Sequence, residues 1–159
     1  FIPMMISNMA GGRIAIDYGF KGENYCPVSA CASSSHAVGE AFRKIKYGTL
    51  DACVTGGTEA AITNFSLAGF KTMGALCRGT DPDRLSIPFD KERSGFVMGD
   101  GAAILILEEL EHAKKRGAPI YAEIVGYGAT DDAYHITSPD PEGRGSSKAM
   151  AFAIAEAGI

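Results

Sequence analysis

Residues 28–38 read VSACASSSHAV and mark a change from an extended segment to a helix. The residues before it, Tyr25–Ala30, have the composition of a short strand, and a helical pattern runs from Cys31 to Tyr47, with Gly48 as its stop. A thiol at the first turn of a helix lies near the positive end of the helix dipole, which favours the nucleophilic thiolate. Strand-to-helix turns often carry nucleophiles, so Cys31 is a candidate nucleophile; a buried structural cysteine is the alternative.

The rest of the chain alternates predicted strands with predicted helices, which indicates an α/β layered architecture. The patterns predict helices over 8–18, 64–68, 110–116 and 146–157, strands over 52–56, 102–108 and 121–129, and loops over 78–88 and 130–144. Pro119 is expected to mark a joint, with residues 1–118 belonging to one half and residues 119–159 opening a second.

Composition narrows the classes of function. The 159 residues carry a net charge of −4, which argues against a nucleic-acid-binding surface. The apolar runs are too short to span a bilayer, so no membrane association is expected. The four cysteines form no C-x-x-C pair and predict neither a disulfide framework nor a zinc site, which favours a reducing, cytoplasmic setting and no metal. Both ends of the chain are apolar, from which we expect a piece of a longer protein.

Three further stretches have a composition that suggests a role in a site. Residues 56–59 (GGTE) predict a glycine turn, which either has a purely structural role or lets the backbone approach a cleft. Residues 90–93 (DKER) predict a small ion-pair network. His135 lies on a predicted long loop, where it is either a site residue or a structurally bonded histidine. By contrast, the spacing of His36 from Cys31 on one helix points its ring away from the sulfur, and His112 is expected at the surface.

Four ordered motifs carry a family resemblance that covers the whole chain. They are ACASSSHA (30–37), GGTE (56–59), PFDK (88–91) with GFVMGDG (95–101), and DAYHITSP (132–139). Together they resemble the β-ketoacyl-[acyl carrier protein] synthases, the condensing enzymes of fatty-acid synthesis, and the last motif is most similar to the synthase II branch. The resemblance implies a thiolase-like fold of two α/β halves layered α-β-α-β-α, as a homodimer. Residues 1–118 would then be the late part of the first half, and residues 119–159 the beginning of the second.

The resemblance also implies a chemistry. Cys31 would take an acyl group as a thioester from the phosphopantetheine arm of acyl carrier protein, with no other cofactor. Malonyl carrier protein would then lose carbon dioxide, and its carbanion would attack the acyl group. Phe70, Thr137 and Ser138 would contact the substrate, Thr137 at the pantetheine arm, and His135 would support the cleft. The family's His-Gly-Thr and Gly-His motifs, which hold its two catalytic histidines, do not occur in these residues, so we expect this polypeptide not to condense.

Three alternatives stay open at this point. One is a thiolase or another non-decarboxylating enzyme of the same fold. Another is a cysteine hydrolase, which needs a histidine within hydrogen-bond reach of the sulfur, a part that only His135 could play. The third is a non-catalytic partner like a chain-length factor; such relatives typically replace the nucleophile, whereas Cys31 is present here.

Overall fold

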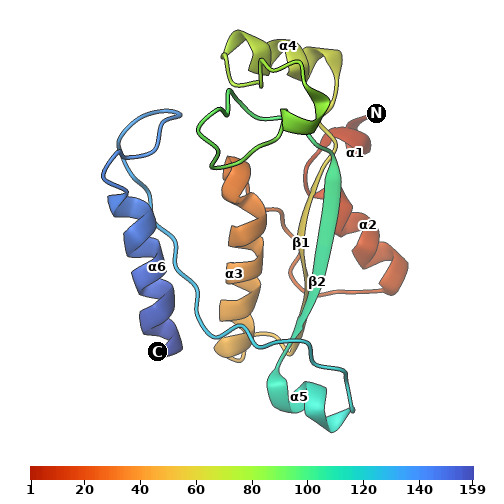
Figure 1. Ribbon diagram of the computed structural model, residues 1–159. Helices are drawn as coiled ribbons and strands as arrows, with labels where there is room; N and C mark the ends of the chain where they lie inside the picture. Colours follow the sequence, from red (N-terminus) through yellow and green to blue (C-terminus); the bar gives the residue numbers. More distant parts are fainter. The chain divides into compact units, whose positions relative to one another are not determined.

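The computed structural model describes all residues, 1–159, and contains six α-helices, two 3-10 helices and one two-stranded sheet (Figure 1). In chain order the elements are α1 (Ile2–Met5), α2 (Met9–Tyr18), η1 (Ala30–Ala32), α3 (Ser33–Lys46), β1 (Ala52–Glu59), α4 (Asn64–Thr72), η2 (Pro82–Arg84), β2 (Gly101–Glu108), α5 (Leu110–Lys115) and α6 (Arg144–Ala157). Two compact units can be distinguished. The first comprises residues 1–56 and 104–159, and the second comprises residues 57–103.

Helices form where the sequence predicts them, because their signals are local. Helix α2 ends at Gly19 and α6 ends at Gly158, and both glycines adopt the left-handed conformation that closes a helix. Helix α3 is amphipathic and has Arg43, Lys44 and Lys46 in its last turn, where cations complement the helix dipole. The predicted helices over 8–18, 110–116 and 146–157 are therefore confirmed.

The sheet consists of β1 and β2, which confirms the strands expected over 52–56 and 102–108. The residue after β2, Glu109, donates its backbone N–H to the carbonyl of Asp51 just before β1 at 2.9 Å, so the two strands run antiparallel. The glycine turn predicted at residues 56–59 is wrong. Gly56 and Gly57 continue β1, with Gly56 at a φ of 146°, a value that a residue without a β-carbon adopts readily.

Two other predicted strands do not form. Residues 25–29 run as irregular chain before η1, and the segment 121–129 has no strand beside it. A strand needs a neighbouring backbone to bond to, and composition alone cannot supply one. Pro27 also removes one N–H donor from the first of these segments.

Residues 126–128 of the second segment pack between α3 and α6 instead, and Figure 1 shows the chain running between these two helices. A β-carbon at Gly126 would lie 2.0 Å from the carbonyl oxygen of Ala153, and one at Gly128 would lie 1.9 Å from that of Ala149. On the side of α3, a β-carbon at Gly39 would lie 2.2 Å from the ring of Tyr127. Glycine at these three positions therefore lets the two helices approach the segment closely.

Glu156 on α6 ties this packing together. Its carboxylate accepts the backbone N–H of Tyr127 at 2.9 Å, lies 3.3 Å from the ammonium of Lys46 and 3.8 Å from the guanidinium of Arg43. The hydrogen bond from Tyr127 is the main reason why the pKa of Glu156 is lowered from its ordinary value. The guanidinium of Arg43 also lies over the Tyr127 ring, 4.9 Å from its centre.

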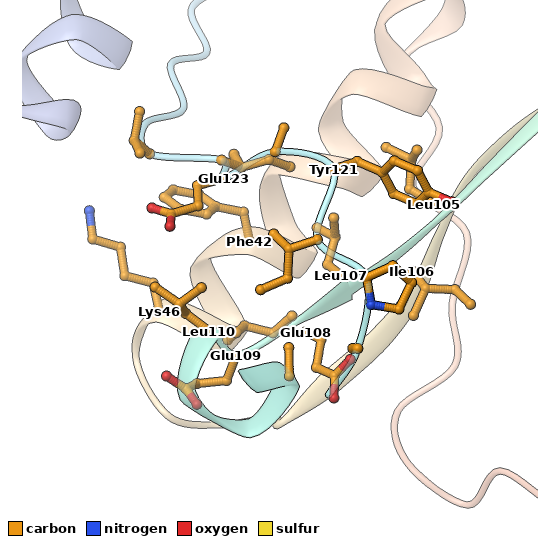
Figure 2. A pocket seen from close by; sticks show the side chains of 18 of the residues that line it. Phe42, Lys46, Leu105, Ile106, Leu107, Glu108, Glu109, Leu110, Tyr121 and Glu123 are labelled. Atoms are coloured by element: carbon orange, nitrogen blue, oxygen red, sulfur yellow. The ribbon is translucent and has the colours of Figure 1, made fainter. Parts of the chain in front are cut away.

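The buried core is small. The buried apolar residues are Ala41 and Phe42 of α3 and Ala113 of α5. The surface area is 12265 Å², whereas a folded monomer of this mass exposes roughly 7600 Å². An apolar cavity of about 930 Å³ opens between the end of β2, α5 and residues 118–125, with Phe42 on its wall (Figure 2). Much apolar surface is thus left without cover from these residues.

Candidate active site around Cys31

Cys31 is the middle residue of η1, and its side chain is exposed to solvent. Helix α3 begins at Ser33, so the sulfur belongs to a 3-10 turn that leads into the helix, rather than to the helix itself as the periodicity suggests. Ala30 has a φ of +50°, in the left-handed region that a residue with a β-carbon rarely adopts. Such a conformation costs of order 1–3 kcal/mol and persists only where the surrounding contacts hold it.

Hydrogen bonds from serine hold the backbone of this turn. The Ser29 N–H donates to Ser33 Oγ at 2.8 Å, and Ser33 Oγ donates to the carbonyl of Ala30, also at 2.8 Å. The Ala32 N–H donates to the carbonyl of Ser29 at 3.1 Å. One serine side chain therefore bonds to the backbone on both sides of the Ser29–Ala30 peptide, next to the strained residue.

His36 contacts the same turn through a partner that the sequence did not suggest. Its Nδ1 lies 2.6 Å from Ser29 Oγ, and its ring meets the edge of Tyr127 at 6.5 Å between ring centres, with the planes at 85°. No side chain forms a hydrogen bond with the sulfur of Cys31 itself. Helical periodicity does not predict the Ser29–His36 pair, because Ser29 lies outside α3 and the chain turns sharply at Ala30 between the two residues.

His135 is bonded within its own loop. Its Nδ1 accepts the backbone N–H of Thr137 at 3.2 Å and that of Ser138 at 3.1 Å, and all three residues are exposed. Of the two readings of His135, the structurally bonded one matches this geometry. The three predicted site residues of this loop are thus brought together by one ring nitrogen.

The base of that loop is closed by a buried carboxylate. Asp140 is 6% exposed, and its side chain accepts from Arg144 Nε at 2.6 Å, which lowers the pKa of Asp140. Its backbone N–H donates to Asp132 at 2.9 Å, so residues eight apart are joined. Gly145 completes the closure, because a β-carbon there would lie 1.9 Å from the Asp132 carboxylate. A polar cavity of about 410 Å³ lies beside these groups.

Phe70 belongs to the second compact unit, on α4. The helix is capped by Thr63, whose side chain accepts the backbone N–H of Ser66. The ring of Phe70 packs edge-to-face against Phe96, 5.3 Å between centres. Its predicted contact with substrate stays a prediction.

The ion-pair network predicted over residues 90–93 has a different cation at its centre. Arg84 of η2 bonds to Asp90 at 3.3 Å and to Glu92 at 2.8 Å, whereas Arg93 reaches only the backbone carbonyl of Asp90. The prediction was wrong about the cation because Arg84 lies outside the charged run and reaches it only when the loop folds back.

The cysteines and the possible metal ligands form no further candidate site. All four cysteines are free. No cluster of three or more potential metal-ligating side chains occurs, and none of the helices is sufficiently long and apolar to span a bilayer.

Comparison with known protein families identifies the family of this chain. Residues 1–113 match the model "Beta-ketoacyl synthase, N-terminal domain", and residues 121–159 match "Beta-ketoacyl synthase, C-terminal domain". The chain belongs to the β-ketoacyl synthase family. Its helices and sheet are accordingly part of the thiolase-like α/β fold of the ketosynthases, as the motifs implied.

Similar proteins and solved structures are consistent with this family assignment. The chain is 57% identical to 3-oxoacyl-[acyl-carrier-protein] synthase 2 of Synechocystis over 159 residues, 99% of this chain and 38% of the relative. It is 54% identical to the Staphylococcus aureus protein of the same name, over 100% of this chain and 40% of the relative. One chain of a solved complex, described as a type II PKS acyl-carrier protein in complex with its ketosynthase bound to the hexaketide, matches with a TM-score of 0.92 at 36% identity, over 96% of this chain and 38% of that one. The chain thus spans about two fifths of the length of these relatives.

Proposed function

We propose that this chain carries the acyl-accepting part of a fatty-acid condensing enzyme, with Cys31 as the nucleophile. The observation that carries the proposal is the exposed thiol on a strained turn at the head of α3, in a chain of the β-ketoacyl synthase family. The complete enzyme would elongate an acyl chain by decarboxylative condensation with malonyl-[acyl carrier protein], as a synthase II.

The acyl-transfer step follows from the chemistry of a thiolate. Cys31 Sγ attacks the carbonyl carbon of an acyl thioester, and a new carbon–sulfur bond forms. The bond to the phosphopantetheine sulfur breaks, and that sulfur leaves as a thiolate, which takes up a proton. Negative charge develops on the carbonyl oxygen during the attack, and the Cys31 backbone N–H at the head of the helix is a suitable donor to it.

The loop that contains His135 would supply contacts to the thioester arm. Thr137 and Ser138 are exposed, and the Nδ1 of His135 shapes the backbone that presents them. We infer that Thr137 contacts the pantetheine and that Phe70 contacts the substrate. The partner would be acyl carrier protein, and its phosphopantetheine arm is the only prosthetic group that the reaction needs.

The proposal includes three properties of the complete protein. It would be a homodimer in the cytoplasm, and its two thiolase-like halves would meet near residue 118. A hydrolase is less well supported, because the Nδ1 of His135 already accepts two backbone N–H groups and no histidine bonds to Cys31. The retained cysteine argues in the same way against a non-catalytic chain-length factor.

Acylation of the isolated chain tests the proposal. The protein is incubated with an acyl-[acyl carrier protein], and the adduct is located by intact mass and peptide mapping. We expect one acyl group on Cys31, none in Cys31→Ala, and a normal yield in Cys26→Ala, a matched control because Cys26 is also free and exposed. Addition of malonyl-[acyl carrier protein] should give no elongated product. Acylation that persists in Cys31→Ala would refute the assignment of the nucleophile.

A further inference from the structure

The backbone of the turn that carries Cys31 is strained, and the hydrogen bonds of Ser33 do not account for all of the contacts that hold it. Ala30 keeps a φ of +50°, and the residue before it, Ser29, has a φ of −148° and a ψ of 46°, outside the regular conformations. Two unusual backbone conformations in succession need contacts that fix them from outside the turn. The side chain of Ser29 points to the group that supplies one.

That group is His36, one turn into α3. Its Nδ1 lies 2.6 Å from Ser29 Oγ, and both residues are half-buried. A hydrogen bond that is sheltered from water is worth more than one at the surface, because bulk solvent does not compete for its partners. The rigid helix thus holds the residue that precedes the strained one.

The ring of His36 is itself held from the other side. Tyr127 meets it edge-on, and Tyr127 is fixed by the guanidinium of Arg43 over its ring and by the hydrogen bond from its N–H to Glu156. Gly39 gives the tyrosine ring room to lie against α3. His36 therefore lies between the nucleophile turn, which matches the N-terminal family model, and a segment that matches the C-terminal one.

We propose that Ser29 and His36 are positioning residues for Cys31, and that Tyr127 braces them. The pair would fix the direction of the sulfur and of the Cys31 N–H, so that both meet a thioester in the geometry of attack. Neither residue touches the reacting atoms. The inference rests on the proposed function, because it concerns the same acyl transfer to Cys31.

Two rates on the same protein test the inference. Acyl transfer from a thioester demands a defined direction of attack, whereas alkylation by iodoacetamide needs only an accessible thiol. Both are followed by mass spectrometry at Cys31, in a background in which Cys26, Cys53 and Cys77 are replaced by serine. A single hydrogen bond of this kind corresponds to roughly a five- to tenfold change.

Ser29→Ala and His36→Phe should therefore slow acyl transfer about five- to tenfold and leave alkylation within about twofold. Ser29→Thr, which keeps the hydroxyl, should recover most of the acyl-transfer rate. Ser35→Ala is the matched control, since it removes the same group from an exposed position of α3 that makes no hydrogen bond.

The outcomes are separable. If Cys31 in the unmodified chain is alkylated but never acylated, the proposed function fails. If that chain is acylated and Ser29→Ala reacts at the same rate, the positioning role is overturned. It is also overturned if the variants lose both rates equally, because the pair then supports only the folded state.

Discussion

Gly128→Ala adds one methyl group at a place where the structure leaves no room for it. The new β-carbon would lie 1.9 Å from the carbonyl oxygen of Ala149, and β-carbon contacts under 3.0 Å essentially do not occur. The segment or α6 must therefore move apart by about 1 Å, which also lengthens the 2.9 Å hydrogen bond between Tyr127 and Glu156.

The magnitude follows from two opposing contributions. Overpacking of this kind costs about 1–3 kcal/mol. Alanine lowers the entropy of the unfolded chain, which returns about 0.4–1 kcal/mol. The net expectation is a loss of about 1–2 kcal/mol in the free energy of unfolding, which lowers the urea midpoint by roughly 0.5–1 M for a chain of this size.

Urea denaturation followed by far-UV circular dichroism measures this loss, with Gly22→Ala as the matched control. Gly22 lies in the same compact unit, and a β-carbon there meets nothing within 4 Å. The control should equal or exceed the unmodified chain in stability. The reasoning is refuted if Gly128→Ala unfolds at the same urea concentration as Gly22→Ala. Trimming Ala149 to glycine should give no rescue, because the obstacle is a backbone oxygen.

Two more predictions concern stability. The Arg116 guanidinium, 2.6–2.7 Å from Glu108, and the hydrogen bond with the His112 ring together lower the pKa of that carboxyl from 4.5 to about 2. A lowered pKa contributes stability that is complete above pH 4.5 and is lost as the pH falls through about 2. Glu108→Gln should therefore destabilise the chain at neutral pH and approach the unmodified chain at about pH 2 in urea titrations across this range; a constant difference would contradict it. Gly39→Ala should destabilise by about 1–3 kcal/mol through collision with the Tyr127 ring, and Tyr127→Ala should relieve that collision, so additive losses in the double variant would contradict the contact.

The helices were predictable because their signals lie within a few residues of one another. Gly117 at a φ of +68° ends α5 where the sequence places a stop, and α6 runs from just before its predicted start to its predicted end. The segments 25–30 and 121–129 have the composition of strands and yet form none. The pairing of a strand depends on residues far away in the sequence. The second segment lies against the helices α3 and α6, with no strand beside it.

The site divides in the same way. The position of Cys31 at the head of a helix follows from a local pattern and is present in the structure. The Ser29–His36 contact depends on a left-handed alanine, a conformation that alanine disfavours and that no sequence pattern announces. Likewise, Arg84 becomes the partner of Asp90 only through the fold of its loop.

The apolar pattern of β2 predicts more burial than the strand has in the structure. Its run Ala102–Leu107 is apolar at every position, which is typical of a strand that is covered on both faces. In the structure, Ile104 is 50% exposed and Ile106 is 72% exposed. These two side chains lie on the same face of the strand, so at least one face of β2 is not fully covered. A two-stranded ribbon is marginal on its own. A domain that buries its core by itself would cover the apolar faces of β2 and of the cavity beside it. The relatives are about two and a half times as long, and such faces are expected in a protein whose other residues cover them.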